Sequence, residues 1–224
     1  MRPIINYRSA PAYKLSKYLK TILKHKLELP NKYIVTNAAD LYPKDLYPSI
    51  PTTETMDILF RILLGKTEKK IAKEIINTLK TTINQNYFRF NNKIYRQING
   101  LGMGNPTSAI LMEVFMQSLE EKYMEHLTTN LGVSFYARYV DDIICIITGD
   151  KKEQILDYLK EQHKNIAFTM DKEEKGKLNY LDLTIKINKT TNRLEYEIYR
   201  NPTATDTVIH ETLLPPTTTQ KRSI

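Results

Sequence analysis

The sequence predicts an α+β protein in which an antiparallel sheet is backed by helices, and three observations carry this prediction. Helical patterns alternate with short pairs of strands, and the strand–helix–strand units of a parallel sheet are missing. Hydrophobic residues make up 41% of the 224 residues. This share is enough to build a core, so a folded domain is expected and wholesale disorder is excluded.

Three helices are predicted in the first half of the chain, where apolar residues recur every three or four positions. They span residues 14–26, 53–63 and 67–83, and the last two are expected to form a helical hairpin that breaks near Gly65. Pro51 precedes the second helix, and Thr52 and Thr53 are expected to cap it. The third helix should turn an apolar residue at every fourth position toward the core. These residues are Ile71, Ile75, Leu79 and Ile83.

Strands become frequent in the second half. Residues 87–95, interrupted by Asn91 and Asn92, predict a β-hairpin, and a long helix is expected over residues 106–127. The remaining elements continue this alternation of strands and helices. They are strands over residues 133–140 and 143–147, a helix over 151–163, strands over 166–170, 180–187 and 194–199, and an unstructured tail over 215–224.

The charge balance favours a polyanionic partner. Lys and Arg total 33 against 25 Asp and Glu, which gives a net charge of +8 and an isoelectric point near 9.3. Nucleic acid is a partner of this kind, and the alternative is a soluble protein that is merely rich in lysine.

Several classes of protein are excluded. The single cysteine, Cys145, rules out a disulfide framework and is expected to be a packing residue, and no cluster of Cys and His offers a structural zinc site. No apolar run approaches the roughly 18 residues of a membrane span, and the N-terminus lacks the apolar segment of a secretory signal. We therefore expect an intracellular protein, nuclear or cytoplasmic, that is not secreted and has no membrane partner.

The sharpest motif is the YVDD sequence Tyr139-Val140-Asp141-Asp142, in which two acids join two strands. Because adjacent carboxylates repel each other, they are costly to hold together unless a cation neutralises them. Mg²⁺ is suited to this role, since it binds through a few carboxylates together with substrate phosphates. The alternative is an ordinary turn, in which aspartate is common.

A second motif runs from Gln97 to Ser108 and contains Gly100, Gly102 and Gly104. Glycines let the backbone approach a ligand closely, and the N-terminus of the helix that follows attracts anions. No lysine follows at the spacing of a Walker phosphate-binding loop. The alternative is a flexible loop that precedes a helix.

Together the two motifs resemble the palm of reverse transcriptases, most closely the reverse transcriptases of Penelope-like retroelements. The pattern is QxxGxxMGxPxS, followed by the sequence RYVDD that ends at Asp142. Further segments over residues 1–210 resemble the same family. They are residues 2–4 (RPI), 46–51 (LYPSIP), 168–171 (FTMD), 178–183 (LNYLDL) and 199–206 (YRNPTATD, with Asn201 in place of the family's usual lysine).

This resemblance implies the right-hand fold of polymerases. The palm would span residues 31–210, partial fingers would span 1–30, a thumb would be small or missing, and 211–224 would be a disordered tail. The implied function is that of an RNA-directed DNA polymerase from a retroelement, which extends a DNA primer on an RNA template with deoxynucleoside triphosphates. Mg²⁺, or alternatively Mn²⁺, would be the cofactor of a two-metal nucleotidyl transfer.

The resemblance also implies roles for individual residues. Asp141 would be the shared metal ligand, and Asp142 would be a supporting acid and metal ligand near the primer end. Tyr47 would lie beneath the sugar and disfavour a 2′-hydroxyl group, unless it is a core tyrosine, and Arg2 would contact the triphosphate. The template and nucleotide pocket would be shaped by Gln97, Gly100, Met103, Gly104, Pro106 and Ser108.

One departure from the family concerns a further metal ligand. In this family an aspartate lies five residues before the aromatic residue of the first palm motif, and that position is Tyr42 here. Asp40 could serve if the sequence DLYPKDLYP (residues 40–48) contains a two-residue insertion. Alternatively, the strand that carries the acid is absent, because residues 32–41 resemble a helical segment that precedes this motif in relatives.

Three hypotheses follow. The first is an active RNA-directed DNA polymerase. The second is a decayed reverse transcriptase that binds nucleic acid without polymerising, helped by the lysines of residues 14–26 and 66–80. The third is a structural or protein-interaction domain, which leaves the pairing of the two motifs unexplained.

Overall fold

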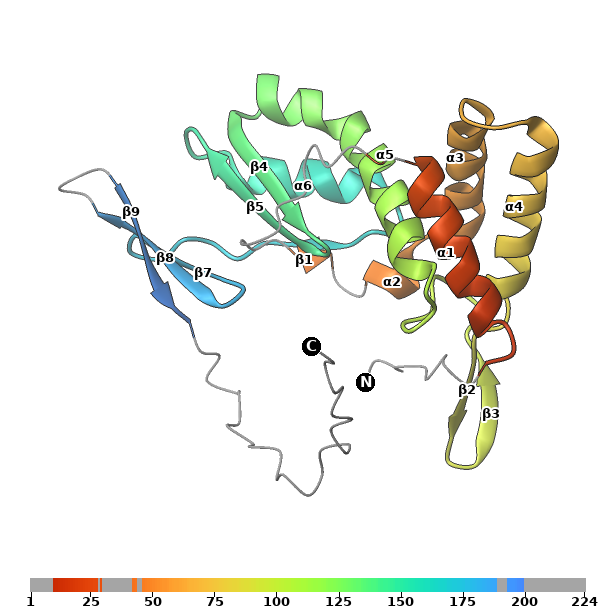
Figure 1. Cartoon of the computed structure of the whole chain (residues 1–224). Helices are drawn as coiled ribbons and strands as arrows, with labels where there is room; N and C mark the ends of the chain where they lie inside the picture. The colour runs from red at the N-terminus through yellow and green to blue at the C-terminus, as the bar shows by residue number, and fades with distance from the viewer. Residues whose placement is uncertain (1–9, 28, 30–41, 44–45, 189–192, 200–224) are drawn as a thin grey trace, which may run out of the picture.

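The structure of the chain is a computed structural model, which describes residues 10–27, 29, 42–43, 46–188 and 193–199. The long helix α5 (Ser108–Thr129) lies at the centre of this part (Figure 1). It is buried along its length and on several sides, as is typical of a helix with neighbours all around it. Helices pack on one side of α5, and a strand pair with a further helix packs on the other.

The helical layer consists of α1 (Tyr13–Leu27), α3 (Thr52–Leu64) and α4 (Lys69–Ile83). Helix α3 packs against both α4 and α5, and α1 contacts all three of these helices. The three predicted helices are confirmed, and so is the hairpin that α3 and α4 form around Gly65. Their leucine and isoleucine side chains form one continuous core with the apolar residues of α5.

Two details of this layer differ from prediction. The threonines at the start of α3 do not cap it, because the helix begins at Thr52 and Pro51 precedes it without a side-chain cap. Ile71 is 41% exposed, whereas Ile75, Leu79 and Ile83 are buried as predicted, together with Ala72 and Ile76. A stripe of every fourth residue advances by about 40° per step around a helix, so its first member leaves the buried face.

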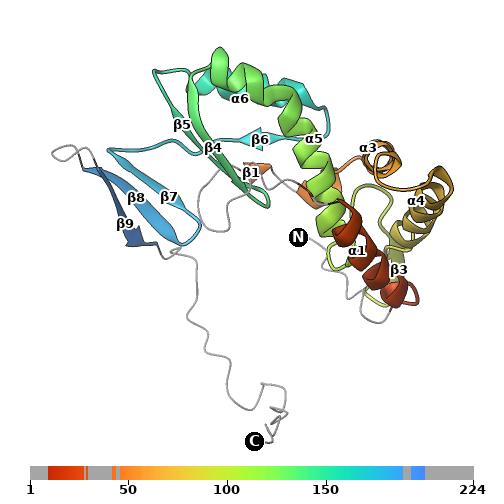
Figure 2. The same ribbon diagram turned by 45° about the horizontal axis from the view of Figure 1, so that its top comes forward.

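The described strands form four separate antiparallel sheets. β4 (Val133–Tyr139) pairs with β5 (Asp142–Ile147) and packs on α5, while α6 (Lys152–Gln162) also contacts α5. The short strands β1 (Tyr42–Pro43) and β6 (Phe168–Thr169) pair with each other, and β1 contacts β5. Figure 2 shows these four strands and α6 together on one side of α5.

The other two sheets extend away from the centre. The hairpin of β2 (Tyr87–Phe90) and β3 (Lys93–Arg96) turns at Asn91 and Asn92, as predicted. Both asparagines have positive φ angles, 45° and 59°, as a tight two-residue hairpin turn requires.

At the opposite end (Figures 1 and 2), β7 (Lys177–Tyr180), β8 (Leu183–Asn188) and β9 (Arg193–Ile198) form a meander. The single strand predicted over residues 180–187 is therefore wrong. The chain turns at Leu181, whose φ is +48°, and Tyr180 pairs with Leu183.

Parts of the prediction lie outside the described residues. These are residues 1–9, including Arg2, the segment that contains Asp40, and the tail over 211–224. Within the described chain, no helix is both long and apolar enough to cross a membrane.

Cys145 is expected to be unreactive in the folded protein. It lies in β5 and packs against the core, and burial raises the pKa of its thiol to about 12. Because only the thiolate reacts, alkylation by iodoacetamide at pH 8 should be at least about a hundredfold slower than for an ordinary cysteine. Intact-mass spectrometry measures this rate, and unfolding in urea should restore it. Rapid alkylation of the native chain would contradict the packing role.

Candidate active site

The YVDD motif forms the turn of the β4–β5 hairpin. Tyr139 pairs directly with Asp142, which leaves Val140 and Asp141 as the two residues of the turn. The prediction that both acids lie between the two strands is therefore corrected. Asp141 lies in the turn and is half-buried, whereas Asp142 is the first residue of β5 and is only 7% exposed.

Val140 adopts a conformation that is unusual for its type. Its φ is +57°, and a β-branched residue in this region is strained. The tight turn imposes this conformation, because one class of two-residue hairpin turn requires a positive φ at its first residue. A fixed contact then holds the strained residue: Nη1 of Arg138 donates a hydrogen bond to the carbonyl oxygen of Val140 at 3.0 Å.

Arg138 is completely buried and uses all five of its N–H donors. Nε and Nη2 donate to the carboxylate of Glu120 at 2.6 and 3.1 Å. Nη2 and Nη1 donate to the carboxylate of Glu113 at 2.7 and 3.2 Å. Both acids lie on α5, so the arginine joins the turn of the hairpin to the central helix.

Burial and charge oppose each other in this cluster. Burial would lower the pKa of Arg138, but its hydrogen bonds to Glu120 and the charges of both acids outweigh burial and raise it. The arginine therefore stays charged. Burial raises the pKa of Glu120, and Arg138 offsets part of that shift. The hydroxyl group of Tyr136 also donates to Glu120, at 2.9 Å, and lies 2.7 Å from the hydroxyl group of Tyr123.

Tyr47 lies close to this hairpin. It belongs to the short helix α2 (Leu46–Ser49), is half-buried and packs against the core. Burial raises its pKa, and the negative charges of Asp141 and Glu113 raise it further. The structure thus brings the LYPSIP segment beside the acidic turn, although nearly a hundred residues separate the two in the chain.

The glycine-rich loop packs onto the same short helix. The backbone N–H of Leu101 donates to the carbonyl oxygen of Tyr47 at 2.7 Å. Gly100 has a φ of +72°, and a Cβ atom there would lie only 2.1 Å from the carbonyl oxygen of Pro48. Both the conformation and the close approach therefore require glycine at this position.

Gly100→Ala should destabilise the fold more than a matched change at Gly149. Gly149 also has a positive φ, +84°, but a Cβ atom there would meet nothing within 4 Å. Its replacement by alanine should cost about 1–2 kcal/mol, which is the cost of the left-handed conformation. Gly100→Ala should cost at least about 2 kcal/mol more, because the methyl group also overlaps Pro48. Urea unfolding of the two variants measures this difference, and equal losses would rule out a close contact between the loop and α2.

The predicted pocket residues play different parts in the loop. Nε2 of Gln97 donates to the carbonyl oxygens of Asn99 and Leu101, at 2.8 and 3.2 Å. Ser108 is buried, and its hydroxyl group donates to the carbonyl oxygen of Gly102 at 2.8 Å, so it holds the loop to the start of α5.

Met103 and Pro106 are half-buried, and Gly104 is exposed with a φ of +102°. Gln97 and Met103 also line a pocket of about 540 Å³. The other residues that line it are Pro48, Arg96, Ile98, Asn99 and Leu101.

A short strand lies where one of the two alternatives expected none. In β1, Tyr42 pairs with Thr169 of β6, and β1 contacts β5. Tyr42, which the resemblance places at the position of the family's acid, thus lies in a strand beside the YVDD hairpin. The candidate replacement, Asp40, lies outside the described residues.

The carboxylates of Asp141 and Asp142 are oxygen donors of the kind that Mg²⁺ prefers. They come from adjacent positions of one hairpin. Among the described residues, no group of three or more His, Cys, Asp and Glu side chains is placed to hold a metal ion. A complete site would therefore need a donor from the part of the chain that is not described or from the substrate.

A comparison with known families now identifies the chain. Residues 6–200 match the family described as "Reverse transcriptase (RNA-dependent DNA polymerase)". The chain belongs to the reverse transcriptase family. As a class, reverse transcriptases use divalent metal ions. No curated protein matches the chain significantly.

Solved telomerase structures share the fold of this reverse transcriptase chain. Apo telomerase from Candida tropicalis, truncated from its C-terminal domain, matches 82% of the chain with a TM-score of 0.51 and 13% identity. Telomerases from Candida albicans and Candida tropicalis, each in complex with a fragment of telomeric RNA, match 91% and 89% of it. Their TM-scores are both 0.52, and their identities are 11% and 15%.

The matched regions confirm the predicted fold class, since the chain shares with them the polymerase palm, a mixed fold of helices and antiparallel strands. The chain covers only 40%, 36% and 36% of the lengths of these three telomerase chains. It therefore corresponds to part of each of these larger proteins.

Proposed function

We propose that the chain is an RNA-directed DNA polymerase that extends a DNA primer on an RNA template with deoxynucleoside triphosphates. The observation that carries this proposal is the convergence of the acidic turn, Tyr47 and the glycine-rich loop on one region. Three separate palm motifs meet there, in a chain that belongs to the reverse transcriptase family. We further propose an origin in a Penelope-like retroelement, on the strength of the RYVDD and QxxGxxMG sequences.

In this proposal Asp141 and Asp142 hold the divalent ions, Mg²⁺ or Mn²⁺. When bound, these ions would activate the primer 3′-hydroxyl group and stabilise the departing pyrophosphate. Arg138 fixes the backbone of the turn and so orients Asp141. Tyr47, beside Asp141, would lie beneath the sugar of the incoming nucleotide and disfavour a 2′-hydroxyl group.

The loop from Gln97 to Ser108 would form the template side of this site. Its internal hydrogen bonds and its packing on Pro48 keep it in place against α2. Rigidity of this kind supports catalysis, because an active site gains rate from groups that are positioned before the substrate arrives. Arg2 would contact the triphosphate.

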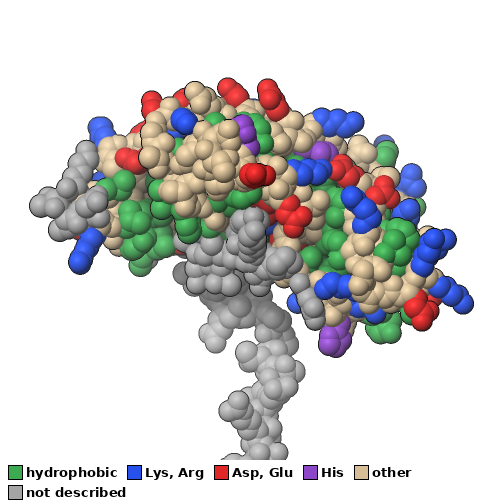
Figure 3. Space-filling model, turned by 90° about the horizontal axis from the view of Figure 1, so that it is seen from above, with side chains coloured by type: hydrophobic (Ala, Val, Ile, Leu, Met, Phe, Trp, Pro, Cys, Tyr) green, Lys and Arg blue, Asp and Glu red, His purple; other side chains and the backbone are tan. Residues whose placement is uncertain are grey.

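The charge of the helical layer supports a nucleic-acid partner. Helix α1 contains no Asp or Glu and exposes Lys14, Lys17 and Lys24. Lysines are also exposed along α4, and Figure 3 shows blue side chains at the end of the molecule that carries this helix. Binding through such contacts should weaken as salt increases, because each phosphate contact releases a counterion.

Primer extension tests the proposal directly. The full chain is incubated with a labelled DNA primer on an RNA template, deoxynucleoside triphosphates and either Mg²⁺ or Mn²⁺. Extension with a requirement for the metal is the expected result. Loss of extension in Asp40→Asn but not in Asp45→Asn would assign the further metal ligand to Asp40.

A second function is favoured by a specific observation, namely the tyrosine in β1 where relatives carry an acid. If extension fails with both metals while the chain binds RNA in a salt-dependent manner, the chain is a decayed reverse transcriptase that retains only binding. Absence of both extension and binding would exclude both functions.

A further inference from the structure

The β2–β3 hairpin has two different faces. The pairing register places Tyr87 opposite Arg96 and Arg89 opposite Ile94, so these four side chains share one face. The other face carries Phe88 opposite Tyr95 and Phe90 opposite Lys93. We call the first set, Tyr87, Arg89, Ile94 and Arg96, the arginine face.

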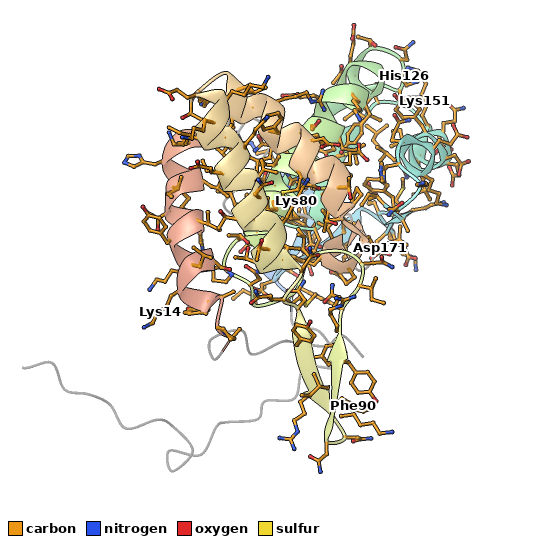
Figure 4. All side chains as sticks on the ribbon, turned by 90° about the vertical axis from the view of Figure 1, so that its right-hand side faces the viewer. Lys14, Lys80, Phe90, His126, Lys151 and Asp171 are labelled. Carbon is orange, nitrogen blue, oxygen red and sulfur yellow. The ribbon has the colours of Figure 1, made fainter. Side chains whose placement is uncertain are left out.

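The face opposite the arginine face is partly used by the fold. Phe88 is half-buried, packs with Ala12 at the start of α1, and stacks on Tyr95 with ring centroids 5.5 Å apart. The arginine face stays open to solvent. Tyr87 is 52% exposed and Ile94 is 76% exposed. Figure 4 shows the hairpin standing out from the helical layer, with Phe90 toward its far end.

The charge along this part of the chain has a single sign. The chain contains no Asp or Glu from Ile75 to Met112, a stretch that includes the whole hairpin and the glycine-rich loop. Arg89 and Arg96 therefore have no acid on their own hairpin, and Nη2 of Arg89 donates to the amide oxygen of Asn92 at 3.0 Å. An exposed aromatic ring between two arginines suits a partner with negative charge and flat rings.

The arginine face also continues into the candidate active site. Arg96 ends β3 and lines the pocket that Gln97 and Met103 share. Ile98, which is 81% exposed, lines the same pocket. A strand lying along the hairpin would therefore reach the glycine-rich loop, and neither segment carries an acidic residue.

We propose that the arginine face binds a single-stranded polynucleotide, the unpaired template strand next to the active site. Bases would stack on Tyr87 and on the planar guanidinium groups, while the arginines neutralise the phosphates. The identity of the strand as template rests on the proposed function, but the binding itself does not require catalysis.

Fluorescence anisotropy with the full chain tests this proposal, without metal or nucleotides. The probe is a labelled single-stranded RNA of about 12 nucleotides, a length typical of such sites. Tyr87→Ala and Arg96→Gln should each weaken binding at least about fivefold. The first change removes a base–aromatic stack, which is worth that much, and the second removes a guanidinium group that stacks on a base and neutralises a phosphate. Arg96→Gln should also lower the salt dependence by about 0.7 in log–log slope, and Tyr87→Ala should leave that slope unchanged.

The opposite face supplies matched controls on the same hairpin. Phe90 is 53% exposed, nearly the same as Tyr87, and Lys93 is exposed like Arg96. Phe90→Ala and Lys93→Gln should change the affinity less than about twofold, and circular dichroism should show all four variants folded. Blunt duplex RNA should bind Tyr87→Ala and Phe90→Ala as it binds the unaltered chain, because its bases are not open to stacking.

Three results would overturn the proposal. They are unchanged affinity in Tyr87→Ala and Arg96→Gln, equal losses on the two faces, and a dimer in light scattering that Tyr87→Ala dissociates. The last result would make the face a protein interface instead. If primer extension fails while binding still depends on the arginine face, the proposed polymerase function is rejected and this binding site stands. If the chain extends primers but its binding does not depend on the arginine face, only this binding site is rejected.

Discussion

Asp141→Asn is expected to abolish metal-dependent primer extension, with a loss on the order of a thousandfold or more. The side chain keeps its size and its place in the turn but loses the charge that a divalent ion needs. Metal ions contribute several kcal/mol to transition-state stabilisation in such reactions, and each 1.36 kcal/mol corresponds to a factor of ten in rate. Single-turnover extension of a labelled primer measures the effect.

A control for this variant is Asp171→Asn. Asp171 is exposed and lies outside the hairpin, so its change should leave extension within about twofold of the unaltered chain. The affinity of the Asp141 variant for single-stranded RNA should also stay the same, because the turn is separate from the arginine face. Extension that persists in Asp141→Asn would remove this residue from the metal site.

Arg138→Leu should cost about 3–5 kcal/mol of stability. Breaking a buried ion pair by removing one partner leaves a buried charge without compensation. Here the carboxylate of Glu120, which is completely buried, would lose both of its bonds to the guanidinium group. Urea unfolding followed by circular dichroism measures the loss.

Two further variants separate charge from geometry. Arg138→Lys keeps the charge but cannot form the five hydrogen bonds. The free energy of unfolding of this variant should therefore lie between those of the unaltered chain and of Arg138→Leu. The double change Arg138→Leu with Glu120→Leu should recover much of the stability, because it removes both buried charges. Arg61→Ala, at an exposed arginine of α3, should change the stability by less than about 0.5 kcal/mol. No recovery in the double variant would mean that packing, not charge, dominates at this position.

The larger elements of the fold could be predicted because each carries its own periodic signal. The helices α1, α3 and α4 follow apolar residues at helical spacing, α5 follows Pro106 at its start, and the β2–β3 turn is marked by two asparagines. Errors arose where the pattern was short or fell at the end of an element. A stripe of every fourth residue misplaced Ile71, and the strand-like alternation of apolar and polar residues over 181–187 concealed the turn at Leu181.

The candidate site was predictable in its sequence motifs but not in its supporting contacts. The acidic turn and the glycine-rich loop are recognisable from local sequence alone. The role of Arg138 depends on contacts with Glu113 and Glu120, which lie 25 and 18 residues away in the chain. One signal was available: the two glutamates are seven residues apart on a helix, so they share one face and can hold a common partner.

The exposure of the β7–β9 meander has a consequence for the dynamics of the chain. These strands pair with one another and pack little against the other described elements, and every residue of β9 is exposed. Segments with few buried contacts open locally at a lower free energy than the global transition. Backbone amides of β8 and β9 should therefore exchange with deuterium well before those of α5, and the meander should behave as a separate cooperative unit beside a slowly exchanging centre.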